Sequence, residues 1–139
     1  MSDLEKAKQL LVSGGYTCAL CKNGNIYTSK ERGVKPLVEW LESDIDLHGF
    51  SAADKVVGKG AAFLYVLLGV YAVYANVISA PALELLHDRG ILTEYEEKTD
   101  RVINRKGDGI CPFEALVIDI DDAQSAYRAI REKMKQMNI

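Results

Sequence analysis

The sequence has few of the residues that most often hold metals or disulfides. Its 139 residues include three cysteines and two histidines. An odd number of cysteines leaves one unpaired, so we expect no disulfide framework and a reducing, cytoplasmic location. His48 and His87 show no recurring ligand spacing with the cysteines, so we expect no metal site and no cofactor. Cys18 and Cys21 are three residues apart on an expected strand, where they would point to opposite faces as packing residues.

An excess of positive charge is also missing. The chain carries 17 Lys and Arg against 20 Asp and Glu, a formal net charge of -3 at pH 7. Because nucleic acids are bound through a basic face, we expect no nucleic-acid partner. The N-terminus is charged where a signal peptide would be apolar. Residues 60–83 are uncharged, but strand-forming residues and Pro81 interrupt a helical pattern, so we expect a buried helix and strand and no membrane contact.

What the sequence does contain is an alternation of helical and extended patterns. Apolar spacing predicts helices at 3–11, 34–42, 60–68 and 82–87, a short helix from Pro112 and a final helix after Asp122. Strands are predicted at 16–21, 25–28, 55–57, 70–78 and 91–96, with a hairpin at Asn23-Gly24 and a loop at 44–53. The chain is therefore predicted to be one domain, residues 1–139, with a three-layer α/β/α sandwich fold and a mixed sheet.

The leading candidate site is the turn from Gly58 to Gly60, where a strand passes through two glycines into an apolar helix. Such a turn directs backbone N–H groups and the positive helix end at one spot, beside Lys59, which suits a phosphate. The alternative is that the glycines only allow the helix to pack closely on its strand. The candidate ligand-binding residues, which include two from a later polar loop, are Asp54, Lys55, Gly58, Lys59, Gly60, Asn104 and Arg105.

A second candidate is Cys111, which Pro112 would place at the N-cap of a helix. The helix dipole would favour a thiolate there, and Glu114 would lie in the first turn. In an enzyme of metal-free chemistry, Cys111 would be the nucleophile and Glu114 or Asp54 would handle protons. The alternative is a small buried hydrophobe, since no histidine near in sequence supplies a base.

Several strings of the chain resemble a prokaryotic family, the domain of unknown function 1893 family. They are DKVVGKGAA at 54–62, VYANVISAPALELL at 73–86, INR at 103–105 and GICPFE at 109–114. That family is assigned a cytidine-deaminase-like fold, so the resemblance implies this fold here.

The zinc motifs of deaminases have no counterpart at the corresponding positions. Zinc deaminases begin one helix with a metal ligand and a catalytic Glu, and begin the next with Pro-Cys-x-x-Cys. The matching positions read Lys59-Gly60-Ala61-Ala62 and Pro81-Ala82-Leu83-Glu84-Leu85. The resemblance therefore implies a deaminase-like scaffold without its zinc site, and hydrolytic deamination is not expected.

Three functions remain open from the sequence. The first is binding of a nucleotide or phosphorylated metabolite at the Gly58–Gly60 turn. The second is the metal-free enzyme that uses Cys111. The third is a ligand-free interaction module, in which the uncharged residues 60–78 partly serve the contacts of a homodimer.

Overall fold

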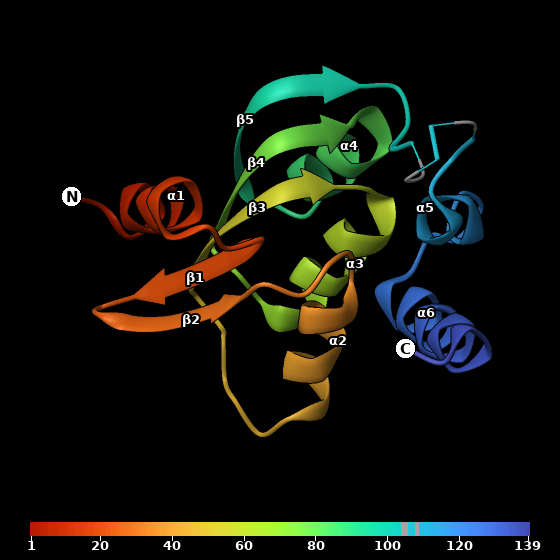
Figure 1. The fold of residues 1–139 in the computed structure, drawn as a ribbon, viewed down its shortest axis with the longest axis horizontal. Helices are drawn as coiled ribbons and strands as arrows, with labels where there is room; N and C mark the ends of the chain where they lie inside the picture. The colour runs from red at the N-terminus through yellow and green to blue at the C-terminus, as the bar shows by residue number, and fades with distance from the viewer. Residues whose placement is uncertain (104–105, 108) are drawn as a thin grey trace.

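A computed structural model describes residues 1–103, 106–107 and 109–139 of the protein (Figure 1). The helices are α1 (Asp3–Gly14), α2 (Lys35–Glu42), α3 (Lys59–Leu68), α4 (Ala80–Asp88), α5 (Pro112–Leu116) and α6 (Ala123–Met137). The strands are β1 (Cys18–Lys22), β2 (Asn25–Ser29), β3 (Ser51–Val57), β4 (Ala72–Ser79) and β5 (Leu92–Thr99). The predicted ligand-binding residues Asn104 and Arg105 lie outside the described residues.

The strands form one mixed sheet in the order β2-β1-β3-β4-β5. Strand β1 runs antiparallel to both β2 and β3, while β3, β4 and β5 are parallel to one another. The β1–β2 hairpin turns at Asn23 and Gly24, which have φ values of 50° and 85°. These positive φ values at both central positions are typical of the tight hairpin turn that the Asn-Gly pair predicts. The predicted hairpin and the mixed sheet are confirmed.

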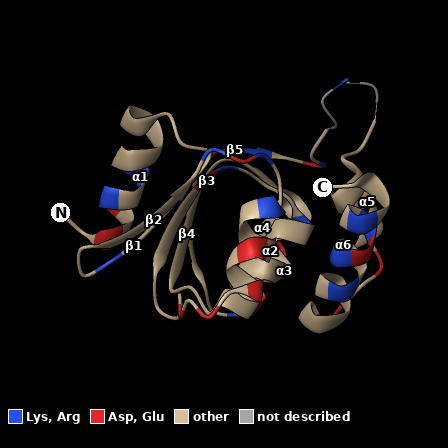
Figure 2. Ribbon diagram, turned by 60° about the horizontal axis from the view of Figure 1, so that its bottom comes forward, with Lys and Arg blue, Asp and Glu red and all other residues tan. Residues whose placement is uncertain are grey.

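The sheet is covered unequally on its two faces (Figure 2). Helix α1 packs on β1, β3 and β4, and its Ala7 and Leu11 share a small apolar cluster with Cys21 and Tyr74. Helices α2, α3 and α4 cover the other face over the main core, and α6 packs on α3 from outside. Cys18 belongs to this main core, so the two cysteines of β1 do point to opposite faces. The predicted three-layer α/β/α sandwich is confirmed, with α5 and α6 added beyond it.

Boundary predictions were wrong for β3 and β5. Residues 44–53 were expected to form a loop, but β3 begins at Ser51 and pairs with β1 and β4 from that residue onward. Ala52 and Ala53 are fully buried. Small residues have weak strand propensity, so the local sequence carries little sign of a strand that tertiary pairing imposes. Strand β5 likewise runs to Thr99, beyond the predicted end at residue 96.

Helix α3 is buried along most of its length because the sheet lies on one side and α6 on the other. This burial explains the uncharged stretch that begins at Gly60. No helix in the described part of the chain is both long and apolar enough to cross a membrane.

Candidate functional site

The predicted strand–glycine–helix turn is present at the amino end of α3. Strand β3 ends at Val57, Gly58 is the N-cap, and the helix begins at Lys59. Gly58 has no side chain with which to bond the first N–H groups of the helix. These groups therefore require an acceptor from elsewhere in the chain or from a ligand.

Glu114 supplies that acceptor from α5. Its Oε1 accepts a hydrogen bond from the N–H of Lys59 at 3.4 Å, and its Oε2 accepts one from the N–H of Val102 at 3.2 Å. The side chain is only 2 % exposed. The residue lies in the first turn of α5, as predicted, but its carboxylate acts as an internal cap for a helix 55 residues earlier in the chain.

Close packing rather than backbone conformation distinguishes both glycines of the turn. Gly58 has an extended backbone, with φ of −93° and ψ of 177°. A Cβ on Gly58 would lie 2.5 Å from Glu114 Oε2 and 3.2 Å from Val102 Cγ2. A Cβ on Gly60 would lie 3.3 Å from the carbonyl oxygen of Phe113. The close approach of α5 therefore explains how these glycines would allow close packing, the alternative to a phosphate site.

The ammonium of Lys59 is also bound to the segment that follows α5. Its Nζ donates to the carbonyl oxygen of Ile118 at 2.9 Å and lies 5.6 Å from the centre of the Phe63 ring. Together with Glu114, this contact fastens α5 and its neighbouring residues to the start of α3.

Asp54 belongs to a separate buried group on β3. The hydroxyl of Tyr65 donates to Asp54 Oδ2 at 2.7 Å, and the Cys18 Sγ lies 3.2 Å from the same hydroxyl. Burial raises the pKa of Asp54 to about 7, although hydrogen bonds from Tyr65 and from the amides of Val56 and Lys55 lower it. Burial and the charge of Asp54 raise the pKa of Cys18 well above its ordinary value, so this thiol stays protonated.

The three candidate catalytic residues do not form one hydrogen-bonded group. Cys111 is the N-cap of α5, as predicted, and is partly exposed. Its backbone N–H donates to the carbonyl oxygen of Val102 at 2.8 Å. Within the described residues, no hydrogen bond links the side chains of Cys111, Glu114 and Asp54 to one another. Lys55 is exposed, next to Asp54 in sequence but outside its buried group.

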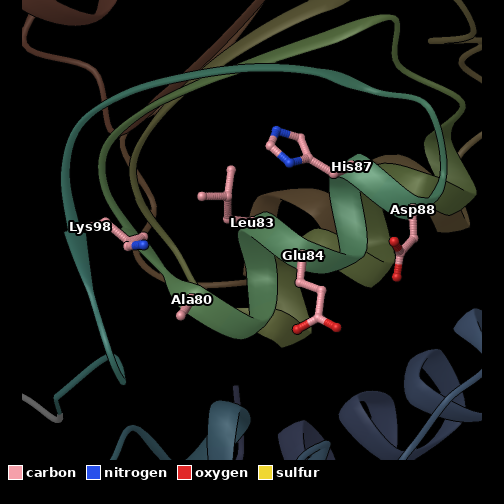
Figure 3. A pocket seen from close by; sticks show the side chains of 6 residues that line it. All are labelled: Ala80, Leu83, Glu84, His87, Asp88 and Lys98. Carbon is pink, nitrogen blue, oxygen red and sulfur yellow. The ribbon is translucent and has the colours of Figure 1, made fainter.

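A hollow that the sequence did not predict lies between α4 and β5 (Figure 3). Its volume is about 340 Å³. His87 and Leu83 point into the space between helix and strand, whereas Glu84 and Asp88 point the other way. Glu84, Asp88, Ala80 and Lys98 of β5 complete the lining, and none of the predicted site residues takes part. The helical spacing of Leu83, Glu84 and His87 predicts a helix and gives no sign of the hollow.

Metal-binding side chains do not gather in the parts of the chain that the structure describes. Across residues 1–103, 106–107 and 109–139, no group of three or more His, Cys, Asp or Glu side chains could hold a metal ion.

Comparison with known proteins gives a family but no activity. The model of the family described as "Domain of unknown function (DUF1893)" matches residues 6–134. The structure is similar to the crystal structure of a DUF1893 family protein from Thermotoga maritima, with a TM-score of 0.87 and 32% sequence identity, covering 96% of this chain and 91% of that chain. It is also similar, much more distantly, to the dCMP deaminase of cyanophage S-TIM5 in apo form, with a TM-score of 0.44, 17% identity and coverage of 69% and 93%. Comparison with curated proteins found no match. The matched family model and the Thermotoga maritima structure show that this chain belongs to the DUF1893 family.

Proposed function

We propose that this protein binds a nucleotide or a phosphorylated metabolite at the amino end of α3, with Gly58, Lys59 and Gly60 around the phosphate. The observation that carries the proposal is the hydrogen bond from the Lys59 N–H to the carboxylate of Glu114. An oxyanion already lies at the positive end of a ten-residue helix, next to two glycines that leave room for it. Phosphate oxygens favour the same environment.

Other predicted residues would extend the site on either side of the phosphate. Lys55 is exposed three residues before Gly58 and would meet the remainder of the ligand. Asp54 lies in the buried group with Tyr65 and Cys18 and stays a predicted contributor only. Asn104 and Arg105 stay predicted contributors.

We also propose that the protein is not a hydrolytic deaminase. Helix α3 begins with Lys59 and Gly60, and the first turn of α4 contains Pro81 and Ala82. The first residues of these two helices include no thiolate or imidazole to bind zinc. They also include no carboxylate to transfer the proton in deamination. A metal-free enzyme that uses Cys111, a homodimer and a cytoplasmic location stay predictions, since no contact in the described residues favours them.

Isothermal titration calorimetry tests the proposal. The wild-type chain is titrated with nucleoside mono-, di- and triphosphates and with sugar phosphates, and Lys59→Ala is titrated with each ligand that binds. We expect the loss of the ammonium to weaken binding by about tenfold or more, since a charge-assisted contact to phosphate is lost. Lys135→Ala on exposed α6 removes the same charge away from the turn and is expected to bind as the wild type does. Absence of binding, or equal binding by Lys59→Ala, would contradict the proposal.

A further inference from the structure

Strand β5 is an open edge of the sheet (Figure 1). It pairs with β4 on one side, and none of the strands in residues 1–103, 106–107 and 109–139 pairs with its other side. The strand is eight residues long, and all of its residues except Thr93 and Thr99 are exposed. An edge of this length presents a row of backbone N–H and C=O groups on which another strand can pair.

The charge of β5 determines which strand would pair there. The strand contains Glu94, Glu96 and Glu97, with Lys98 as its one basic residue. If β5 paired antiparallel with the β5 of a second copy along its full length, Glu94 would lie opposite Glu97 at two symmetry-related positions. Like charges opposite each other across strands are destabilising, whereas opposite charges stabilise the pair. The glutamates therefore disfavour a second copy and favour a partner strand that carries Lys or Arg.

Two of these glutamates lie on the face of the sheet that α1 covers. Glu94 Oε2 lies 3.4 Å from the ammonium Nζ of Lys8, and Glu96 Oε1 accepts a hydrogen bond from the hydroxyl of Tyr74 at 3.2 Å. Lys8 belongs to α1, and Tyr74 shares the apolar cluster beneath that helix. Exposed ion pairs contribute little to stability, so a second cation would approach these carboxylates without a large loss. A partner strand would therefore place its basic side chains on this face.

The opposite face of β5 is suited to apolar side chains. Tyr95 is paired with Ala75 of β4, which belongs to the main core, so Tyr95 points to the side of the sheet that α4 covers. The hollow between α4 and β5 lies on this side, where Leu83 and His87 point into the space between helix and strand (Figure 3). Lys98 also lines this hollow, which disfavours a basic side chain there. Because side chains alternate along a strand, every second residue of a partner would meet this face.

From the open edge, its glutamates and the hollow beside it, we infer that β5 binds an extended segment of another protein as an added strand. In that segment Lys or Arg alternates with apolar residues. Its backbone bonds to the outer edge of β5, its basic side chains pair with Glu94 and Glu96, and its apolar side chains lie against Tyr95 and toward the hollow. The anion site proposed at α3 takes no part, so the two proposals succeed or fail independently.

NMR of the isotope-labelled full chain tests this inference with a synthetic peptide of alternating Lys and Val, equal in length to β5 and capped at both ends. We expect chemical-shift changes in β5 and α4. We also expect slower amide exchange at every second residue of β5, because the backbone N–H groups of a strand point alternately to its two sides. Strand β2, the other edge of the sheet, should keep its exchange rates. A peptide of alternating Glu and Val is the control and should not bind.

A charge-reversed variant tests the role of the glutamates. We expect Glu94→Lys combined with Glu96→Lys to weaken binding of the Lys–Val peptide by about tenfold, since two opposite-charge pairs become like-charge pairs. Glu39→Lys combined with Glu132→Lys makes the same change in net charge on exposed residues of α2 and α6. At physiological salt, where distant charges are screened, this matched control should bind as the wild type does.

Several results would overturn the inference. They are absence of binding by the Lys–Val peptide, equal binding by the Glu–Val peptide, and equal weakening by the two double variants. Slower exchange that spares β5 would do so as well, because the peptide would then bind elsewhere. Sedimentation of the free protein tests the second copy as occupant, since a dimer whose β5 amides are already protected would show that the chain itself fills this edge.

Discussion

Gly58 and Glu114 are so close that a methyl group on Gly58 would lie 2.5 Å from the Oε2 atom of Glu114. Alanine is compatible with the extended backbone of this residue, so Gly58→Ala tests the packing of the new methyl group against Glu114 and Val102. Glu114 would have to leave the N–H groups of Lys59 and Val102. We expect the free energy of unfolding in urea to fall by about 1–3 kcal/mol, the usual effect of leaving buried polar groups unpaired.

The control for this prediction is the same glycine substitution in a Glu114→Ala background. Without the carboxylate the new methyl group loses its closest contact and keeps only the approach to Val102, so Gly58→Ala should cost clearly less there than in the wild type. A double-mutant cycle measures this difference as a coupling energy. Equal costs in the two backgrounds would show that the contact with Glu114 is not the reason for glycine at this position.

The hydroxyl of Tyr65 connects Cys18 and Asp54 in the core, and its removal should affect both stability and ionisation. Tyr65→Phe leaves Asp54 without its 2.7 Å hydrogen bond. We expect a loss of about 1–3 kcal/mol in the free energy of unfolding. Because the bond from Tyr65 lowers the pKa of Asp54, its loss should raise that pKa further above 7, which NMR titration of the carboxyl carbon would measure. Tyr71→Phe, at a residue 62 % exposed, should change neither quantity.

Much of the fold could be predicted because its signals are local. The Asn23-Gly24 turn, the glycines of the Gly58–Gly60 turn and the helix start at Pro112 each act within a few residues. The start of β3 could not be predicted in this way. Ala52 and Ala53 are strand residues because β1 and β4 lie on either side, and their small side chains give no pattern of their own.

The candidate site also depends on tertiary contacts that local sequence signals do not predict. The sequence predicts an anion position at the start of α3 and an acidic residue at the start of α5. Nothing in the spacing indicates that Glu114 reaches across 55 residues to fill that position, because the contact depends on how α5 packs on α3. The polar lining of the hollow between α4 and β5 is also formed by tertiary packing, which brings Lys98 and His87 to the same hollow.

The three cysteines should differ widely in their reactivity. Cys18 and Cys21 are buried, and burial raises the pKa of each thiol, whereas Cys111 is partly exposed. With iodoacetamide at about pH 8, we expect Cys111 in the folded protein to react roughly tenfold or more faster than the other two, because the thiolate is the reactive form. Mass spectrometry of peptides measures the rates, and all three should react similarly in urea. Fast labelling of Cys18 in the folded state would contradict the buried thiol–phenol–carboxyl group.

The buried carboxyl of Asp54 should make stability fall as the pH rises toward neutrality. Its native pKa of about 7 lies above the ordinary value of 3.8, so between these two pH values the native state holds a proton that the unfolded chain has lost. Unfolding then releases a proton, and the free energy of unfolding decreases with pH until about 7 and levels off above it. Asp54→Asn removes this dependence. Urea unfolding of both proteins across this range should show the wild type losing stability relative to the variant by on the order of a few kcal/mol.

Asp122 provides a control of opposite sign. It caps α6, and the hydrogen bond from the Ser125 N–H lowers its pKa below the ordinary value of 3.8. Asp122 stabilises the native state above that value, and this stabilisation is lost as the pH falls through its native pKa. Asp122→Asn should therefore leave unchanged the decline in the free energy of unfolding toward neutral pH. The prediction for Asp54 fails if the wild type and Asp54→Asn lose stability in parallel between about pH 4 and pH 7. In that case Asp54 would be ionised throughout this range, and the core around Tyr65 would have to accommodate a charge.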